Sequence, residues 1–271
     1  NQMIATYGGS EANVAVSLAN FGIPTEFVTR LPDNAVARAC IASLRANGLG
    51  TEGIVFGGKR MGLYFLESGA AFRNSNVVYD REGSSFATLR PGMIDWEKIF
   101  SDAGWFHWSG IAAALSQDGA DACREALEIA DRMGLTISCD LNFRKKLWNY
   151  GSSAAEVMQP LVQYSDVIFG AEPEYKEILG IQPVGFKAVD AEDTTFEANL
   201  PAFEDFGRRV VELVPRCQKA FLELRNSITS NHNLLAAILY SDNTLKHTGV
   251  YDIECSDYSL VPALVYLCGR R

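Results

Sequence analysis

Short apolar runs alternate along most of this chain with segments whose apolar residues recur at helical spacing. That spacing predicts helices at residues 11–21, 35–47, 119–133, 154–163 and 201–214. The apolar runs predict strands at residues 26–30, 105–109, 135–140, 166–169, 220–224, 234–240 and 250–254. Strands that alternate with helices are typical of βαβ units, so we expect an α/β fold with a central, mostly parallel sheet flanked by helices. In such a sheet, ligands bind at the carboxyl ends of the strands.

Residues 54–89 follow a different pattern. Short extended segments are predicted at residues 54–56, 62–67 and 77–79, and glycines mark the turns between them. No helical spacing interrupts this stretch. We therefore expect residues 54–89 to contribute a small antiparallel sheet that is distinct from the main body.

Charge and composition narrow the function classes. The 271 residues carry a net charge of -9, which argues against nucleic acid and anionic membranes as partners. An anionic small molecule stays possible as a substrate, because local arginines can override the overall sign. The six cysteines form no C-x-x-C pair and are expected to be free thiols in the cytoplasm. No apolar run reaches about 18 residues, so we expect a soluble protein.

Two glycines stand directly before the first predicted helix, whose expected N-cap is Ser10. Gly8 and Gly9 let a ligand approach the backbone closely, and the helix start adds unpaired N–H donors. Asn13 adds a large polar side chain to a largely apolar helix. The pattern indicates a binding site for a polar ligand. The alternative is a tight turn with a local cap.

Polar residues directly follow two of the predicted strands. Asp140 ends one of them, and Asn142 and Arg144 come next. The planar guanidinium of Arg144 suits a carboxylate or a phosphate. Glu174 follows the strand at residues 166–169, and its carboxylate suits a Mg²⁺-bound water near phosphates. The alternatives are a solvated loop at Arg144 and, at Glu174, an acidic group that complements a helix dipole.

The small predicted sheet carries Tyr64, Tyr79 and Arg81. Alternate residues of a strand share a face, so Tyr79 and Arg81 should point the same way. A phenol and a guanidinium on one face could close over a polyhydroxy acid. The alternative is ordinary cross-strand packing. The chain contains no His and Cys cluster at metal-ligand spacing, and no Walker A loop.

Taken together, these segments resemble the ribokinase-like (PfkB) carbohydrate kinases. Residues 7–15, Tyr-Gly-Gly-Ser-Glu-Ala-Asn-Val-Ala, are similar to that family's N-terminal G-G-x-x-x-N-x-A motif. Within the family, the 2-keto-3-deoxygluconate kinases are more similar than ribokinase at residues 60–67, 79–81, 140–148 and 224–227. The resemblance covers residues 4 to about 255. It implies a single kinase domain over residues 1–271, in which residues 54–89 form most of a β-sheet lid over the sugar.

The resemblance also implies roles for individual residues. Gly8, Gly9 and Asn13 would contact sugar hydroxyls. Tyr64, Tyr79 and Arg81 would reach the sugar from the lid. Arg144 would meet the substrate carboxylate or the transferred phosphate and take part in catalysis. Asn142 and Ser227 would lie near ATP, and Glu174 would help to place Mg²⁺.

The implied activity is ATP-dependent phosphorylation of a 2-keto-3-deoxy sugar acid at its terminal hydroxyl. One alternative is another sugar kinase of the family, such as a fructokinase. A second is a non-catalytic sugar-acid-binding pseudokinase. Arg81 and Arg144 favour an acidic substrate over a neutral one. Many relatives associate through the lid, so a homo-oligomer, a dimer or larger, is also expected.

Three departures from the family pattern bear on the site. The family's D-x-x-G-A-G-D motif, whose last Asp is the catalytic base, is expected just after Cys255 but does not follow it. The usual first strand before Gly8 is also missing. We expect segments before about residue 4 and after about residue 255 to be absent from this sequence; a true deletion would leave a kinase without its base. Ala171 stands where the family usually has Asn, which bears on the metal site.

Overall fold

The computed structural model describes residues 4–67, 76–192, 194–229 and 232–254. The chain divides into two compact units. The first unit comprises residues 4–65 and 78–89 of the described chain, and the second comprises all of its other described residues. The peptide bond between Cys255 and Ser256, where the family pattern ends, lies outside the described residues.

The first unit is built on two helices and a short parallel strand pair. Its elements are α1 (Ser10–Asn20), β1 (Thr29–Leu31), α2 (Ala35–Ala46) and β2 (Ile54–Phe56). Strands β1 and β2 pair in parallel, and small apolar residues of α1 and α2 pack into one core with them. The predicted cap at Ser10 is wrong: the helix begins at Ser10, with Gly9 at the N-cap, and the Ser10 hydroxyl donates to Glu11 instead.

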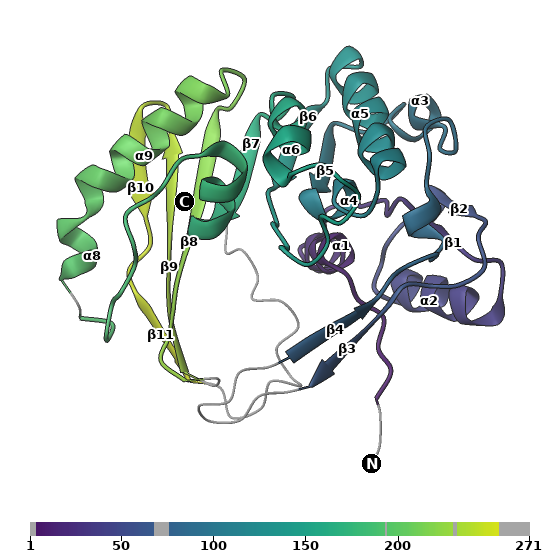
Figure 1. Ribbon diagram of the computed structural model, residues 1–271, viewed down its shortest axis with the longest axis horizontal. Helices are drawn as coiled ribbons and strands as arrows, with labels where there is room; N and C mark the ends of the chain where they lie inside the picture. The colour runs from purple at the N-terminus through teal and green to yellow at the C-terminus, as the bar shows by residue number, and fades with distance from the viewer. Residues whose placement is uncertain (1–3, 68–75, 193, 230–231, 255–271) are drawn as a thin grey trace. The chain divides into compact units, whose positions relative to one another are not determined.

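A two-stranded antiparallel sheet, here called the lid, follows in the chain. It consists of β3 (Leu63–Glu67) and β4 (Asn76–Asp80), and a 3-10 turn, η1 (Phe86–Thr88), comes after it (Figure 1). The prediction that residues 54–56 join this small sheet is corrected, because β2 pairs with β1. The reason is that Ile54 is buried in the core of the first unit, whereas every residue of β3 is exposed.

The side chain of Arg60 anchors the lid by binding backbone carbonyl groups at the end of β4. The guanidinium donates to the carbonyl oxygen of Glu82 at 2.8 Å and to that of Asp80 at 3.0 Å. It also pairs with the Asp80 carboxylate at 2.5 Å. An isolated two-stranded ribbon has little stability of its own, so these contacts fix the end of β4.

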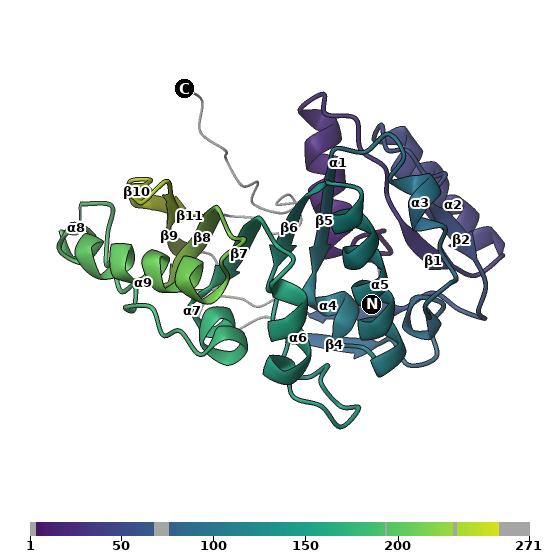
Figure 2. The ribbon, with the colours of Figure 1, turned by 90° about the horizontal axis from the view of Figure 1, so that it is seen from above.

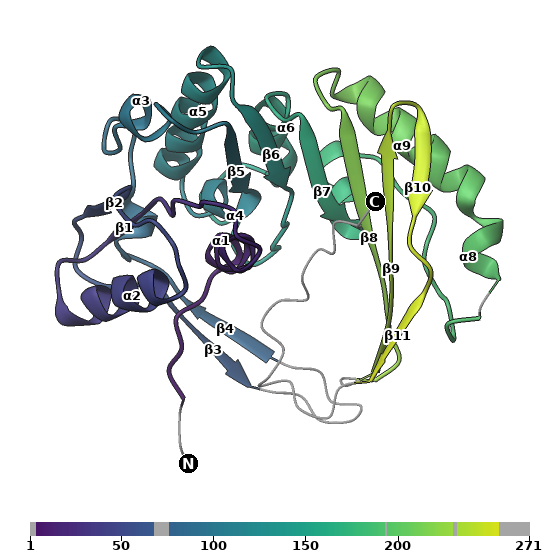
Figure 3. The same ribbon diagram turned by 180° about the vertical axis from the view of Figure 1, so that it is seen from behind.

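A seven-stranded sheet forms the centre of the described second unit. Its strands are β5 (Trp105–Ser109), β6 (Thr136–Asp140), β7 (Val167–Ala171), β8 (Lys219–Ser227), β9 (His232–Ser241), β10 (Thr244–His247) and β11 (Tyr251–Glu254). The order is β10-β9-β8-β7-β6-β5, with β11 beside β9 (Figure 3). Strands β5 to β8 are parallel, as predicted, and β9 to β11 are antiparallel. Only four residues join β8 to β9, too few for the crossover that a parallel pair needs.

Helices cover one face of this sheet. Those of the second unit are α3 (Trp96–Ile99), α4 (Gly110–Ala113), α5 (Gln117–Arg132), α6 (Ala154–Val162), α7 (Glu172–Glu174), the π-helical turn η2 (Tyr175–Leu179), α8 (Thr195–Ala198) and α9 (Leu200–Leu213). Helices α5, α6 and α9 lie on the same side of the strands (Figure 2). Helix α9 approaches β9 so closely that a Cβ atom at Gly207 would lie 2.3 Å from the Cβ of Tyr240.

Residues 183–199 are less exposed than their acidic sequence suggests. The sequence predicts a surface excursion here, but Phe186, Ala188 and Phe196 are buried. These three apolar residues attach the segment to the unit, while residues 189–192 and 194–195 between them are exposed, as the surface prediction expects. Within the described ranges, no helix is both long and apolar enough to cross a membrane.

Arg216 joins several elements at the amino-terminal ends of the strands. Its guanidinium contacts both carboxylate oxygens of Asp166, at 3.1 and 3.2 Å, and also pairs with Asp131 at the end of α5. Asp166 in turn accepts the N–H of Ile137 in β6 at 2.7 Å. The arginine and the aspartate are both more than two-thirds buried, so this pair is screened less than a surface pair.

We predict that Arg216→Ala lowers the free energy of unfolding by about 2–3 kcal/mol, because it leaves the largely buried Asp166 carboxylate without its cation. Urea unfolding of both proteins would measure the change. Arg208→Ala is the matched control, since Arg208 pairs with Asp205 and Glu212 on an exposed helix face, and its unfolding midpoint should barely move. Equal effects of the two substitutions would contradict a special role for Arg216.

Candidate functional site

The carboxyl ends of β6 and β7 meet at one edge of the sheet. Asp140, the last residue of β6, is in register with Phe169, and Ala171, the last of β7, is in register with Glu223 of β8. Because the strands are parallel, the residues that follow β6 and β7 come together here. The sequence predicts that Asn142, Arg144 and Glu174 lie at this edge, because they follow these strands.

Glu174 lies at the centre of this edge, and its side chain is only 13% exposed. Its Oε2 accepts the N–H of Ala171 at 2.8 Å, and its Oε1 lies 3.9 Å from Nη1 of Arg144. Burial raises the pKa of Glu174 above its usual value, and the nearby Glu223 carboxylate adds to the rise. The N–H groups of Ala171 and Phe143 and the Arg144 guanidinium oppose it. The carboxylate is therefore buried but well supplied with donors.

Asn142 lies on the same loop in an unusual conformation. It is 4% exposed and has a positive φ of 40°, while its N–H donates to Oδ1 of Asp140 at 3.1 Å. Its side-chain amide oxygen is buried and has no hydrogen-bond partner among the described residues. Arg144, two residues on, stays 47% exposed at the side chain. The structure thus brings Asn142, Arg144 and Glu174 together, as the sequence suggested.

Ser227 belongs to a different cluster. It lies four residues beyond Glu223 on β8, about 13 Å further along the strand at roughly 3.3 Å per residue. Its hydroxyl donates to Oδ1 of Asn233 at 2.8 Å, and Arg225 donates to the same oxygen at 2.8 Å. The contacts of Ser227 therefore place it with Arg225 and Asn233 rather than with Glu174.

In the first unit, the glycine pair lies beside two of the predicted side chains. A Cβ atom at Gly8 would lie 3.6 Å from the hydroxyl of Tyr64 and 3.8 Å from Oδ1 of Asn13. Gly9 has φ 157° and ψ 151°, a region almost restricted to glycine. The local turn therefore requires Gly9, while the missing side chain of Gly8 leaves the Tyr64 and Asn13 polar groups uncovered on that side.

Tyr79 and Arg81 share a face of the lid, which confirms the predicted alternation. The Arg81 guanidinium lies over the Tyr79 ring, 4.6 Å from the ring centroid. Tyr64, on the partner strand, is 46% exposed, and Tyr79 is partly exposed, so neither ring belongs to a core. An arginine held by an aromatic ring keeps its donors available for an anion.

Several contributors to these sites have no side-chain motif. Ala171 and Phe143 act through backbone N–H groups, which the sequence does not reveal. Glu223 could have been found, because it is a charged residue that directly follows the apolar run at residues 220–222 of β8, and it lies on the exposed face of the strand. No group of three or more His, Cys, Asp or Glu side chains within the described chain is arranged to hold a metal ion.

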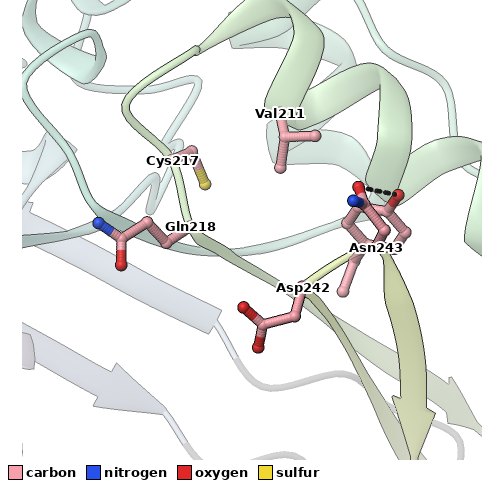
Figure 4. Close-up of a pocket in the computed structure, with 6 residues that line it drawn as sticks. Val211, Cys217, Gln218, Asp242 and Asn243 are labelled. Carbon is pink, nitrogen blue, oxygen red and sulfur yellow. Dashed lines mark hydrogen bonds between the residues drawn. The ribbon is translucent and has the colours of Figure 1, made fainter.

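A separate hollow of about 260 Å³ opens at the other end of β8 (Figure 4). It is lined by Val211, Cys217, Gln218, Tyr240, Asp242 and Asn243. Burial raises the pKa of the Cys217 thiol to about 12, so the thiol is a poor nucleophile. The hollow lies at the amino-terminal ends of the parallel strands, opposite to the edge where Glu174 and Asn142 meet.

Comparison with known proteins decides the family. Residues 1–202 match the model of the pfkB family of carbohydrate kinases. The chain belongs to this family. Its fold resembles the crystal structure of 2-dehydro-3-deoxygluconokinase from Thermotoga maritima, with a TM-score of 0.84 and 36% identity over 93% of this chain and 73% of that one. The family resemblance drawn from the sequence is confirmed.

Two curated relatives illustrate the range of activities within the family. The 2-dehydro-3-deoxygalactonokinase of Haloferax volcanii is 32% identical over 203 residues, which is 75% of this chain and 61% of that protein. Fructokinase-1 of Oryza sativa is 31% identical over 178 residues, 65% of this chain and 54% of that protein. The chain therefore spans between half and about three-fifths of the length of these relatives.

We predict that Glu174 titrates above its usual pKa of 4.5 and that Arg144→Ala raises this pKa further, because the substitution removes a stabilising positive charge. Carboxyl ¹³C NMR of glutamate-labelled protein would measure both values. Since the folded state holds this proton more tightly than the unfolded chain, the stability that Glu174 contributes falls as the pH rises through the folded pKa.

Arg132→Ala is the control for this titration, since it removes a guanidinium that pairs with Glu97 instead. It should leave the pKa of Glu174 unchanged. A wild-type value at or below 4.5, or the same value in the Arg144 variant, would show that burial and the Arg144 charge do not govern this carboxylate.

Proposed function

We propose that this protein phosphorylates a 2-keto-3-deoxy sugar acid at its terminal hydroxyl, with ATP as the phosphoryl donor. The observation that carries the proposal is the presence of two accessible arginines, Arg81 and Arg144. Each is oriented by a neighbour, Arg81 by the Tyr79 ring and Arg144 by the Glu174 carboxylate. A neutral sugar would leave Arg81 without an anionic partner, whereas Arg144 could also serve the transferred phosphate. The names of the Thermotoga and Haloferax relatives support the same substrate class.

The first unit supplies groups that fit a polyhydroxy ligand. Gly8 allows close approach to the backbone, while the Asn13 amide and the Tyr64 hydroxyl can both donate and accept hydrogen bonds. Tyr79 and Arg81 add an aromatic surface and a cation on one face of the lid. We propose that Gly8, Gly9, Asn13 and Tyr64 contact the sugar hydroxyls. Arg81 would bind the carboxylate, with Tyr79 beside it.

The second unit supplies groups that fit phosphates and a hydrated cation. Arg144 presents a planar guanidinium to a carboxylate or to the transferred phosphate. The unpartnered oxygen of Asn142 and the Glu174 carboxylate are hard acceptors, which suit waters bound to Mg²⁺. Ser227 lies beside the Arg225 cation, an arrangement that fits an anionic part of ATP. The metal would offset the negative charge of the phosphates when bound.

The chemistry then needs positioning and charge stabilisation more than covalent assistance. Phosphoryl transfer spreads negative charge over the transferred group, and fixed cations such as Arg144 lower the barrier if they face it. A general base must also take the proton of the attacking hydroxyl. That base is not assigned to a described residue.

Two other functions follow from the same family. A fructokinase is favoured by the similarity to the rice enzyme, but a neutral ketose leaves Arg81 without an anionic partner. A protein that binds the sugar acid without transferring phosphate would keep the same contacts. Binding and turnover therefore have to be measured separately to distinguish these three functions.

We expect wild-type protein to phosphorylate 2-keto-3-deoxygluconate with a higher kcat/KM than fructose, in an assay coupled to ADP release. Arg81→Ala should raise KM for the acid about 10- to 100-fold, since a hydrogen bond to a charged group contributes about 1.5–3 kcal/mol. The substitution should affect fructose much less. Arg81→Lys should restore only part of the activity toward the acid, because the lysine ammonium is a point charge and cannot reproduce the planar, two-donor geometry of a guanidinium.

Calorimetry with the acid separates the remaining outcomes. Binding without turnover would indicate the non-catalytic protein, and a wild-type preference for fructose would indicate the fructokinase. Equal losses for both substrates in Arg81→Ala would reject the carboxylate assignment. Arg38→Ala is a matched control, because Arg38 is an exposed arginine of the same unit that pairs with Asp33.

The proposal also includes a homo-oligomer formed through the lid. Strand β3 exposes Leu63 and Phe65, which share one face because alternate strand residues do, and β4 exposes Val78, each by 44–55%. So many apolar side chains on a narrow two-stranded sheet are typical of an interaction surface, and a second copy of the same surface is self-complementary.

We predict a dimer or larger assembly by sedimentation equilibrium, which Phe65→Lys should weaken by placing a charge in the apolar contact. Leu213→Lys, at a similarly exposed position on α9, should leave the mass unchanged. A monomeric wild type, or equal effects of the two lysines, would exclude association through the lid.

We place this activity in the cytoplasm as part of the same proposal. Cys40, Cys139 and Cys217 carry free, buried thiols, which fits a reducing compartment. The proposed phosphoryl donor, ATP, is also available there.

A further inference from the structure

The backbone at Asn142 is held in a conformation that side chains rarely adopt. Within the described chain, positive φ angles outside glycine occur at Asn142, Asp242 and Asn243. The last two form the two-residue turn between β9 and β10, where hairpin geometry calls for them. Asn142 lies in no hairpin. Its left-handed conformation therefore needs support from the surrounding structure.

Two hydrogen bonds supply that support. The N–H of Leu141 donates to the carbonyl of Phe169 at 2.9 Å, and its side chain is fully buried, so the chain is fixed just before the turn. The N–H of Asn142 then donates to Oδ1 of Asp140 at 3.1 Å. Of these two bonds, only the one to Asp140 depends on the identity of a side chain.

The turn determines where two functional groups lie. It brings the Arg144 guanidinium to 3.9 Å from the Glu174 carboxylate. It also leaves the amide oxygen of Asn142 buried without a partner. Buried polar atoms are almost always hydrogen-bonded, so an exception calls for an explanation, and a bound water, ion or ligand is one. The turn thus leaves the Asn142 oxygen without a partner in the part of the chain that the structure describes and places the Arg144 guanidinium beside Glu174.

We propose that Asp140 is a positioning residue for the phosphoryl-transfer site, a role that rests on the function proposed above. Its carboxylate holds the left-handed turn at Asn142, so that the Asn142 oxygen stays available to a donor on the bound nucleotide or its hydrated cation. The same turn keeps Arg144 beside Glu174. Asp140 acts through these residues and has no contact of its own with the reacting atoms.

Limited trypsin digestion tests the turn without requiring activity. Arg144, Lys145 and Lys146 are exposed, so cleavage after them reports the opening of this loop. Asp140→Ala should accelerate cleavage there about fivefold or more relative to cleavage after Arg209 on α9, the reference site. Asp140→Asn keeps an oxygen acceptor for the Asn142 N–H and should be cut at the wild-type rate. Equal rates in wild type and Asp140→Ala would overturn the proposal.

A glycine at position 142 makes the test sharper. Glycine adopts the left-handed conformation without strain, so Asn142→Gly needs less help from Asp140. Adding Asp140→Ala to Asn142→Gly should therefore accelerate cleavage less than adding it to the wild type. The same acceleration in both backgrounds would show that Asp140 does not act through this turn.

Kinetics then separate positioning from direct chemistry. Asp140→Ala should lower kcat at least about tenfold and Asp140→Asn should recover most of that loss, because the acceptor rather than the charge is needed. A loss in Asp140→Asn as large as in Asp140→Ala would assign a base or metal-binding role to the carboxylate and overturn the proposal. If wild-type protein shows no phosphoryl transfer, the proposed function fails, while the digestion still decides whether Asp140 holds the turn.

Discussion

A buried carboxylate has to be compensated, and at Glu174 that requirement organises the carboxyl edge of the sheet. The side chain is removed from water, so its charge depends on donors that the protein itself supplies. Ala171 gives one at the end of β7, while Phe143 and Arg144 approach from the loop after β6. Those two segments meet because β6 and β7 are parallel and in register. The chemistry available at this edge is thus a consequence of how one negative charge is accommodated.

Most of the fold could be predicted from the sequence, because periodicity reports which residues are buried. The strand at residues 105–109 and the helix near residues 154–162 lie where the pattern places them. Pairing partners are harder to predict, since they depend on residues distant in the chain. For that reason β2 was assigned to the wrong sheet, and the short strand β10 was not foreseen.

Some features of the candidate site could likewise be predicted from the sequence, and others could not. Arg144 and Glu174 could be brought together from sequence, because both follow parallel strands. The left-handed turn at Asn142 could not, since asparagine also occurs in ordinary loops and only the structure shows its φ angle. The family resemblance assigns both Asn142 and Ser227 to ATP, and that assignment stays a prediction. The sequence could not show the local contacts of Ser227, because β8 runs beyond its pairing with β7 and the serine hydroxyl meets Asn233 on β9.

The way in which Arg60 holds the lid bears on how substrate preference can change during evolution. Two of its three contacts are with main-chain oxygens, at Asp80 and Glu82, which every amino acid provides. Substitutions at Tyr79 or Arg81 therefore alter what the lid recognises without removing its attachment. A lineage could exchange one sugar for another through a few lid residues while keeping the same scaffold, which is one physical reason why a single fold can serve many sugars.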